Sequence, residues 1–183
     1  MSNLQIALDD TRRWLERAVV GLNLCPFAKA VLAKGQVHFA ATPAQDAAGI
    51  LEAFAAELDA LVALPASERD TTLLVIPQGM DDFLAFLDLV ARAERLVRKR
   101  GQGGVVQVAH FHPLFVFADA DEDDITNCTN RSPYPTLHLL REESMDRAVA
   151  AFPDPAAIYE ANMARLQELG PEGWDALGVG ATR

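Results

Sequence analysis

The segment "TTLLVIP", residues 71–77, limits the fold more than any other feature of the chain. It is a continuous run of leucine and β-branched residues between threonine and proline, which is typical of a strand buried on both faces. Amphipathic segments lie before and after it, at 43–64 and at about 81–99, and the second ends in the basic run "RLVRKR" that complements a helix dipole. Strands that alternate with helices indicate an α/β fold with a partly parallel sheet.

The rest of the chain continues this alternation. We therefore expect an α/β (or α+β) fold, a single layered domain with a roughly four-stranded, partly parallel sheet packed by five or six helices. Residues 1–170 should form this globular domain, and the glycine-rich residues 171–183 a loose C-terminal tail that Trp174 could dock. The remaining predicted helices are 4–21, 26–34, 142–152 and 155–170, and the remaining predicted strands are 36–42, 104–111 and 136–140.

Charge and hydropathy exclude several classes of partner. The chain has 183 residues, enough for one domain with a substantial core, and 16 Lys and Arg against 26 Asp and Glu give a formal charge of −10. This charge repels nucleic-acid backbones and anionic membranes, so neither nucleic acid nor membrane is an expected partner. No window reaches the roughly 20 apolar residues of a membrane span, and the first residues lack a signal-peptide pattern, so we expect a cytoplasmic protein.

Cys25 is the first residue whose position suggests chemistry. It precedes Pro26 in "NLCPFAKAVLAKG", and a thiol at the start of a helix can have a lowered pKa and become nucleophilic. The "CPFA" turn locally resembles the active-site turn of glutaredoxins and omega-class glutathione transferases, without their second cysteine or their preceding strand. The alternative is a small buried side chain between two helices. With Cys128 as the only other cysteine, we expect two free thiols.

The motif "HFHP" offers a second candidate. In a strand, His110 and His112 point to one face, and they could bind a transition metal if a third ligand came from elsewhere. Two histidines alone are weak evidence for metal, so both remain only weak candidates, and hydrogen-bonded structural imidazoles are the alternative. His112 follows a strand end, where α/β folds place ligand crevices, and we expect it to be a general acid or base. No nucleotide-binding motif occurs in the chain.

The stretch "TNCTNRSPYP", residues 126–135, concentrates amides, hydroxyls, a guanidinium and two prolines in ten positions. The prolines restrict the backbone, which would keep polar groups ready to bind a ligand, and an arginine suits a carboxylate or phosphate. We therefore predict a site for a small anionic molecule here. Equally open is a loop whose side chains satisfy one another and the buried backbone. The substrate-binding candidates are Asn127, Asn130, Arg131, Ser132 and Tyr134.

Three stretches, "GLNLCPFA", "FHP" and "NRSPYPTLHLLRE", together resemble an uncharacterised bacterial family of proteins of about this length, domain of unknown function 1415. The resemblance runs roughly from Trp14 to Val149 and implies a family without implying an activity. In that family the position of Cys128 usually holds an aromatic residue, and the position of His110 need not hold histidine. The resemblance therefore weakens a His110–His112 metal site and a Cys25–Cys128 redox pair.

Three functions remain open on the sequence. The first is a small-molecule enzyme acting on an anionic metabolite, with His112 as acid or base and Cys25 as nucleophile or thiol ligand. The second is a non-catalytic binding or interaction module with a structural Cys25, and the third is a metal-binding protein that uses His110 and His112. The enzyme is narrowly favoured. The substrate, the reaction and the oligomeric state are not encoded in these patterns.

Overall fold

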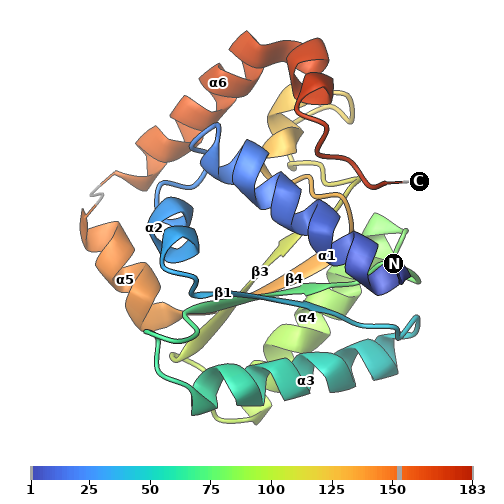
Figure 1. Cartoon of the computed structure of the whole chain (residues 1–183), viewed down its shortest axis with the longest axis vertical. Coiled ribbons are helices and arrows are strands. Elements are labelled where there is room, and N and C mark those ends of the chain that lie inside the picture. Colours follow the sequence, from blue (N-terminus) through green and yellow to red (C-terminus); the bar gives the residue numbers. More distant parts are fainter. Residues whose placement is uncertain (1, 152–153, 183) are drawn as a thin grey trace.

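A four-stranded mixed sheet forms the centre of the protein (Figure 1), in a computed structural model that describes residues 2–151 and 154–182. The strands are β1, Val37–Ala41; β2, Thr71–Val75; β3, Val106–Phe111; and β4, Thr136–Arg141. Their order across the sheet is β1-β2-β4-β3. β1 is parallel to β2, whereas β4 is antiparallel to both β2 and β3, so the sheet is mixed.

Helices cover both faces of this sheet. They are α1, Asn3–Trp14, with a π-helical continuation, Leu15–Val20; α2, Ala28–Ala33; α3, Ala47–Ala63; α4, Phe83–Lys99; a 3₁₀ helix, Ile125–Thr129; α5, Glu142–Ala151; and α6, Pro155–Ala176. Figure 1 shows α3 and α4 on one face of the sheet and α1 and α2 on the other. The predicted single α/β domain, with its partly parallel four-stranded sheet, is confirmed. Among the helices described, none combines the length and the apolar character needed to cross a membrane.

β2 is the most buried strand, as its apolar sequence predicts, and all five of its residues are buried. Because neighbouring side chains of a strand point to opposite faces, Leu74 packs with Ile50 and Phe86 under α3 and α4, and Leu73 packs with Trp14 under α1. Burying each of these leucines stabilises the fold by roughly 1.5–3 kcal/mol. The sheet therefore has one apolar core on each side.

β4 brings a histidine into the layer between the sheet and α2. Leu137 and Leu139 are fully buried on the α3–α4 side, so His138 between them points to the opposite face. The strand register places His138 beside Leu73, which belongs to the core under α1. The alternation along β4 thus fixes the side of the sheet on which His138 lies.

The chain between α1 and β1 differs in detail from its prediction. The predicted helix 26–34 begins only at Ala28. Before it, Asn23 has a φ of 55° and ends the preceding helix in the left-handed conformation. Cys25 and Pro26 occupy a turn that the Ala28 N–H closes by donating to the Cys25 carbonyl, at 3.2 Å. Cys25 consequently precedes a short helix of six residues, and its position in the turn exposes it in part.

The C-terminal segment makes contacts that the predicted loose tail, 171–183, does not anticipate. Gly170 has a φ of 66°, which allows the chain to turn before Pro171 and continue as helix to Ala176. Beyond α6 the chain returns alongside α1 (Figure 1), where Val179 is buried. Val179 and Thr182 thus hold the segment against the domain, although most residues of 171–182 are exposed. Arg183 and Phe152, at the ends of the predicted tail and of the predicted helix 142–152, lie outside the described residues.

Candidate functional site

Most side chains of the predicted polar loop bind main-chain groups. The amide of Asn127 is fully buried, and its Oδ1 accepts from the Phe117 N–H at 2.9 Å while its Nδ2 donates to the Asp121 carbonyl at 2.8 Å. The Ser132 hydroxyl donates to the Tyr134 carbonyl at 2.6 Å. These contacts correspond to the alternative in which the loop side chains satisfy the buried backbone.

Arg131 shares this arrangement but keeps one free donor group. Its Nε donates to the Phe115 carbonyl at 3.0 Å, and its Nη2 donates to the Glu122 carbonyl at 2.6 Å. Its Nη1 donates to no residue that the structure describes. Arg131 therefore holds two loops together and still presents its Nη1 amino group.

The Tyr134 side chain joins the loop to α1. Its hydroxyl donates to Oδ2 of Asp10 at 2.9 Å. Burial, together with the hydrogen bond to Asp10 and the charge of Asp10, raises the pKa of Tyr134 to about 12. Tyr134 therefore stays protonated at neutral pH and acts as a hydrogen-bond donor.

The loop does lie beside the histidine strand, as the sequence predicts. The His112 N–H donates to the Asn130 carbonyl at 3.2 Å, and the Asn130 side chain makes no hydrogen bond to another described residue. The His112 ring is fully buried, and its Nε2 lies 2.9 Å from the Met80 carbonyl while the Leu114 N–H donates to its Nδ1 at 3.0 Å. These two partners assign the proton to Nε2.

The hydrogen bonds of the His112 ring limit its predicted role as a general acid or base. Burial lowers its pKa, although the Met80 carbonyl and nearby carboxylates act in the opposite direction. Because both ring nitrogens bind the main chain, neither is free to exchange a proton with a ligand in this conformation. The catalytic role of His112 remains a prediction, and its contacts favour a structural role at the exit of β3.

His110 lies on the same face of the sheet as His112, since both rings pack against Phe86. Burial lowers the pKa of His110 as well. Within the described ranges 2–151 and 154–182, no group of three or more His, Cys, Asp and Glu side chains is placed to hold a metal ion. The two histidines thus have no third ligand there.

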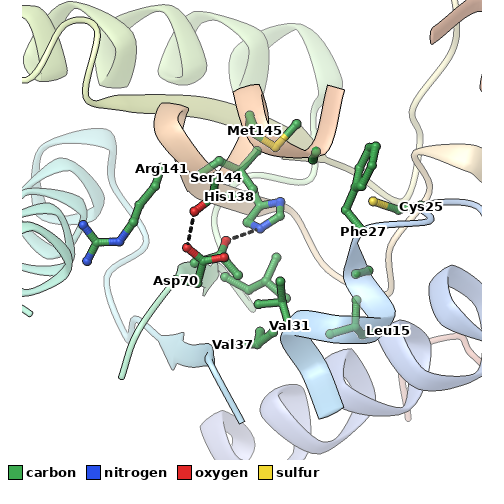
Figure 2. Close-up of a pocket in the computed structure, with 15 residues that line it drawn as sticks. Leu15, Cys25, Phe27, Val31, Val37, Asp70, His138, Arg141, Ser144 and Met145 are labelled. Atoms are coloured by element: carbon green, nitrogen blue, oxygen red, sulfur yellow. Dashed lines mark hydrogen bonds between the residues drawn. The ribbon is translucent and has the colours of Figure 1, made fainter. Parts of the chain in front are cut away.

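Cys25 lies on a different cavity from the polar loop. The cavity has a volume of about 90 Å³ and lies between α2, α5 and the sheet. Figure 2 shows the Cys25 thiol and the His138 ring pointing into the same space, which Phe27 borders on one side and Met145 on another. We call this cavity the Cys25–His138 pocket. Its other lining residues are mostly apolar: Leu15, Ala28, Val31, Val37, Asp70, Thr71, Leu73, Leu140, Arg141, Ser144 and Ala148.

Arg131 and Ser132 instead line an open groove, with Cys128, Asp123 and Asp175 among its other residues. Among the residues that the structure describes, none lines both the groove and the Cys25–His138 pocket. Burial raises the pKa of the Cys128 thiol to about 11, and nearby Arg131 only partly offsets it. The predicted combination of Cys25 with the polar loop in one site is therefore not seen in this arrangement.

His138 is the pocket residue that the sequence analysis did not select. Its Nε2 lies 2.5 Å from the Thr71 hydroxyl, and burial lowers its pKa to about 4. The signal was present in "TLHLLR", where a histidine alternates with leucines that point to the other face. Asp70 and Ser144, hydrogen-bonded to each other at 2.5 Å, complete the polar edge of the pocket (Figure 2).

The fold and the pocket define a single-domain α/β protein with a small, partly open apolar site. In sequence, residues 6–176 match the family described as "Protein of unknown function (DUF1415)", so the chain belongs to that family, as its motifs suggested. No significant match was found to a curated protein or to a solved structure.

Proposed function

We propose that the protein binds a small, predominantly apolar molecule in the Cys25–His138 pocket. The observation that carries the proposal is the character of this cavity, whose walls are almost entirely carbon and whose few polar side chains stand at one edge. Pockets of this kind, apolar with a few convergent polar groups, are typical of small-molecule sites. The sequence left open a non-catalytic binding protein with its site in the polar loop. The present proposal is also a binding function, but its site is the pocket.

The energetics of the cavity support an apolar occupant. Water in such a cavity finds few hydrogen-bond partners. A ligand that displaces this water therefore breaks few hydrogen bonds. Each Å² of apolar ligand surface removed from water contributes roughly 25 cal/mol. Leu15, Val31 and Met145 supply that contact from three different segments of the chain.

A thiol-dependent enzyme is the main alternative for the same pocket, with Cys25 as nucleophile and His138 as base. A base with a pKa of about 4 is a weak proton acceptor at neutral pH. The low pKa of His138 therefore supports binding over catalysis. Its imidazole serves better as a fixed hydrogen-bonding group.

A second candidate function concerns the anionic molecule predicted from the sequence. The observation that favours it is the free Nη1 of Arg131 on the open groove. Asp123 and Asp175 line the same groove and oppose an anion there. This candidate is therefore weaker than the apolar pocket, and a separate measurement tests it.

The experiment for the pocket measures toluene binding by isothermal titration calorimetry in three proteins. Ala148 lines the pocket from α5, and Ala150 is exposed on the same helix. Ala148→Phe fills the cavity and should weaken toluene binding by about tenfold or more, whereas Ala150→Phe should bind like the wild type. Equal affinity of all three proteins, with unchanged circular dichroism, would place toluene elsewhere and overturn the proposal.

A further inference from the structure

We infer that the ligand of the Cys25–His138 pocket is an uncharged, apolar molecule with one hydroxyl group, such as a phenol or a small alcohol, which donates a hydrogen bond to Nδ1 of His138. The inference rests on the proposed function and adds the chemical class of the ligand. It follows from which polar atoms of the pocket are already bonded and which remain free.

The Thr71 hydroxyl determines which ring nitrogen of His138 carries the proton. It donates its proton to the Leu139 carbonyl at 2.7 Å, so its oxygen can only accept from the imidazole. The His138 Nε2, at 2.5 Å, must therefore carry the proton. With a pKa of about 4 the ring holds a single proton at neutral pH, so Nδ1 keeps its lone pair and can accept a hydrogen bond.

Nδ1 of His138 has no partner among the residues that the structure describes. Figure 2 shows the ring standing over the pocket, on the side that faces Cys25. The ring centroid of Phe111 lies 5.8 Å from that of His138, and the Phe111 side chain has no hydrogen-bond donor. A ligand hydroxyl is the group that satisfies this nitrogen.

The other polar side chains at the edge of the pocket already make hydrogen bonds, although Oδ2 of Asp70 accepts none from a described residue. Oδ1 of Asp70 accepts from the Ser144 hydroxyl at 2.5 Å. Arg141 points away from the pocket in Figure 2, and its guanidinium donates to main-chain carbonyls of Leu61, Leu64 and Arg69. Arg141 is thus turned from the cavity and is not directed at a ligand there.

The charge of the ligand follows from these positions. An anion in the pocket would meet the Asp70 carboxylate and the lone pair of His138, and both repel it. An ammonium group would lose its hydration against apolar walls, with one carboxylate that already binds Ser144. A hydroxyl loses far less on leaving water and recovers that loss through Nδ1.

The test compares four small aromatic probes of similar size: toluene, anisole, phenol and benzoate. In the wild-type protein we expect phenol to bind about tenfold more tightly than anisole, the fold-change of one net hydrogen bond, and benzoate to bind more weakly than toluene. His138→Leu removes the acceptor and should abolish the advantage of phenol while toluene still binds. His38→Leu makes the same change at an exposed histidine that does not line the pocket, and it should keep that advantage.

The outcomes separate this inference from the proposed function. If toluene binds but phenol gains nothing over anisole, the hydroxyl class is wrong and the apolar pocket stands. If benzoate, or benzylamine as a cationic probe, binds more tightly than phenol, the ligand is charged and the inference is overturned. If no probe binds at millimolar concentration, the proposed function fails and this inference fails with it.

NMR of the wild-type protein gives a test that does not depend on whether the His138→Leu variant folds. The ¹⁵N resonance of Nδ1 of His138 in the wild-type protein reports directly on hydrogen bonding to its lone pair. Phenol should shift this resonance, and toluene should leave it nearly unchanged. Equal small shifts with both probes would contradict the assigned contact.

Discussion

The hydroxyl of Tyr134 donates to Oδ2 of Asp10 across 124 positions of sequence, at 2.9 Å. The same carboxylate accepts from the N–H of Thr182 at 2.7 Å, from its hydroxyl at 2.6 Å, and from Arg13 at 2.5 Å. Asp10 is only 1% exposed. Burial would raise its pKa, but these hydrogen bonds outweigh it and lower the pKa. The polar loop, α1 and the C-terminal segment therefore meet at one ionised buried group.

We predict that Asp10→Asn lowers the free energy of unfolding by about 2–4 kcal/mol, because an amide cannot accept all four hydrogen bonds and leaves donors unpaired. Urea denaturation measures the effect. Asp9→Asn is the matched control, since Asp9 is exposed, and it should change stability by less than about 0.5 kcal/mol. Similar stability of the two variants would show that the junction at Asp10 contributes little.

The low pKa of His138 predicts a pH dependence of stability. Its pKa is lowered from an ordinary value of 6.5 to about 4, so between these values the unfolded chain binds more protons than the folded protein. The free energy of unfolding should therefore fall as the pH falls from about 6.5 to 4. In His138→Leu the decline should be shallower by up to about 1.4 kcal/mol per pH unit, measured by urea denaturation at several pH values. Parallel curves would contradict this assignment, because the other histidines remain in both proteins.

Alkylation should distinguish the two thiols. Cys25 is half-buried on the pocket, whereas Cys128 is buried and its pKa is raised to about 11. We expect N-ethylmaleimide to label Cys25 in the native protein at neutral pH and to leave Cys128 unmodified, as mass spectrometry of peptides can show. Iodoacetate, which is anionic, should react with Cys25 more slowly relative to free cysteine than the uncharged maleimide does. Preferential labelling of Cys128 would contradict the described burial.

Substitution of Arg131 tests how much the hydrogen bonds of this polar-loop residue contribute to stability. Because its guanidinium donates to the Phe115 and Glu122 carbonyls, Arg131→Ala should lower the free energy of unfolding by about 1–3 kcal/mol. The exposed Arg95 donates to no described residue, and Arg95→Ala should change stability by less than about 0.5 kcal/mol.

The same variant examines the anionic ligand predicted for the groove. Inorganic phosphate at millimolar concentration should raise the thermal midpoint of the wild-type protein if Arg131 binds anions, since a ligand of the native state stabilises it. Arg131→Ala should lose that increase, and Arg95→Ala should keep it. An equal response of all three proteins would indicate a general salt effect and remove the anion site.

The fold could be predicted well because local patterns agree with tertiary packing. The run around Leu73 and Leu74 is apolar enough to define a central strand, and Asp82 caps α4 by accepting from the Ala85 N–H at 2.7 Å, close to the predicted start at 81. The tail was less predictable, because its order depends on Asp10, which lies more than 160 positions away in sequence. Composition alone cannot report such a contact.

The site was harder to predict for a related reason. Asn127 and Ser132 have the same chemistry in a ligand site as in a self-satisfied loop, and only their partners distinguish the two. His112 and His138 both follow apolar strand positions, but the first binds main chain through both nitrogens and the second keeps one free. The difference arises from Thr71 and from the register of β4, which no local motif encodes.

Methyl NMR can show whether a small apolar molecule binds in the Cys25–His138 pocket. In protein labelled with ¹³C at the methionine methyl groups, Met145 lines the pocket, while Met80 is buried in the core under α3 and α4. On addition of toluene we expect a saturable shift of the Met145 resonance and little change at Met80. A Met145 resonance that does not move, or that moves no more than Met80, would show that toluene does not bind in this pocket.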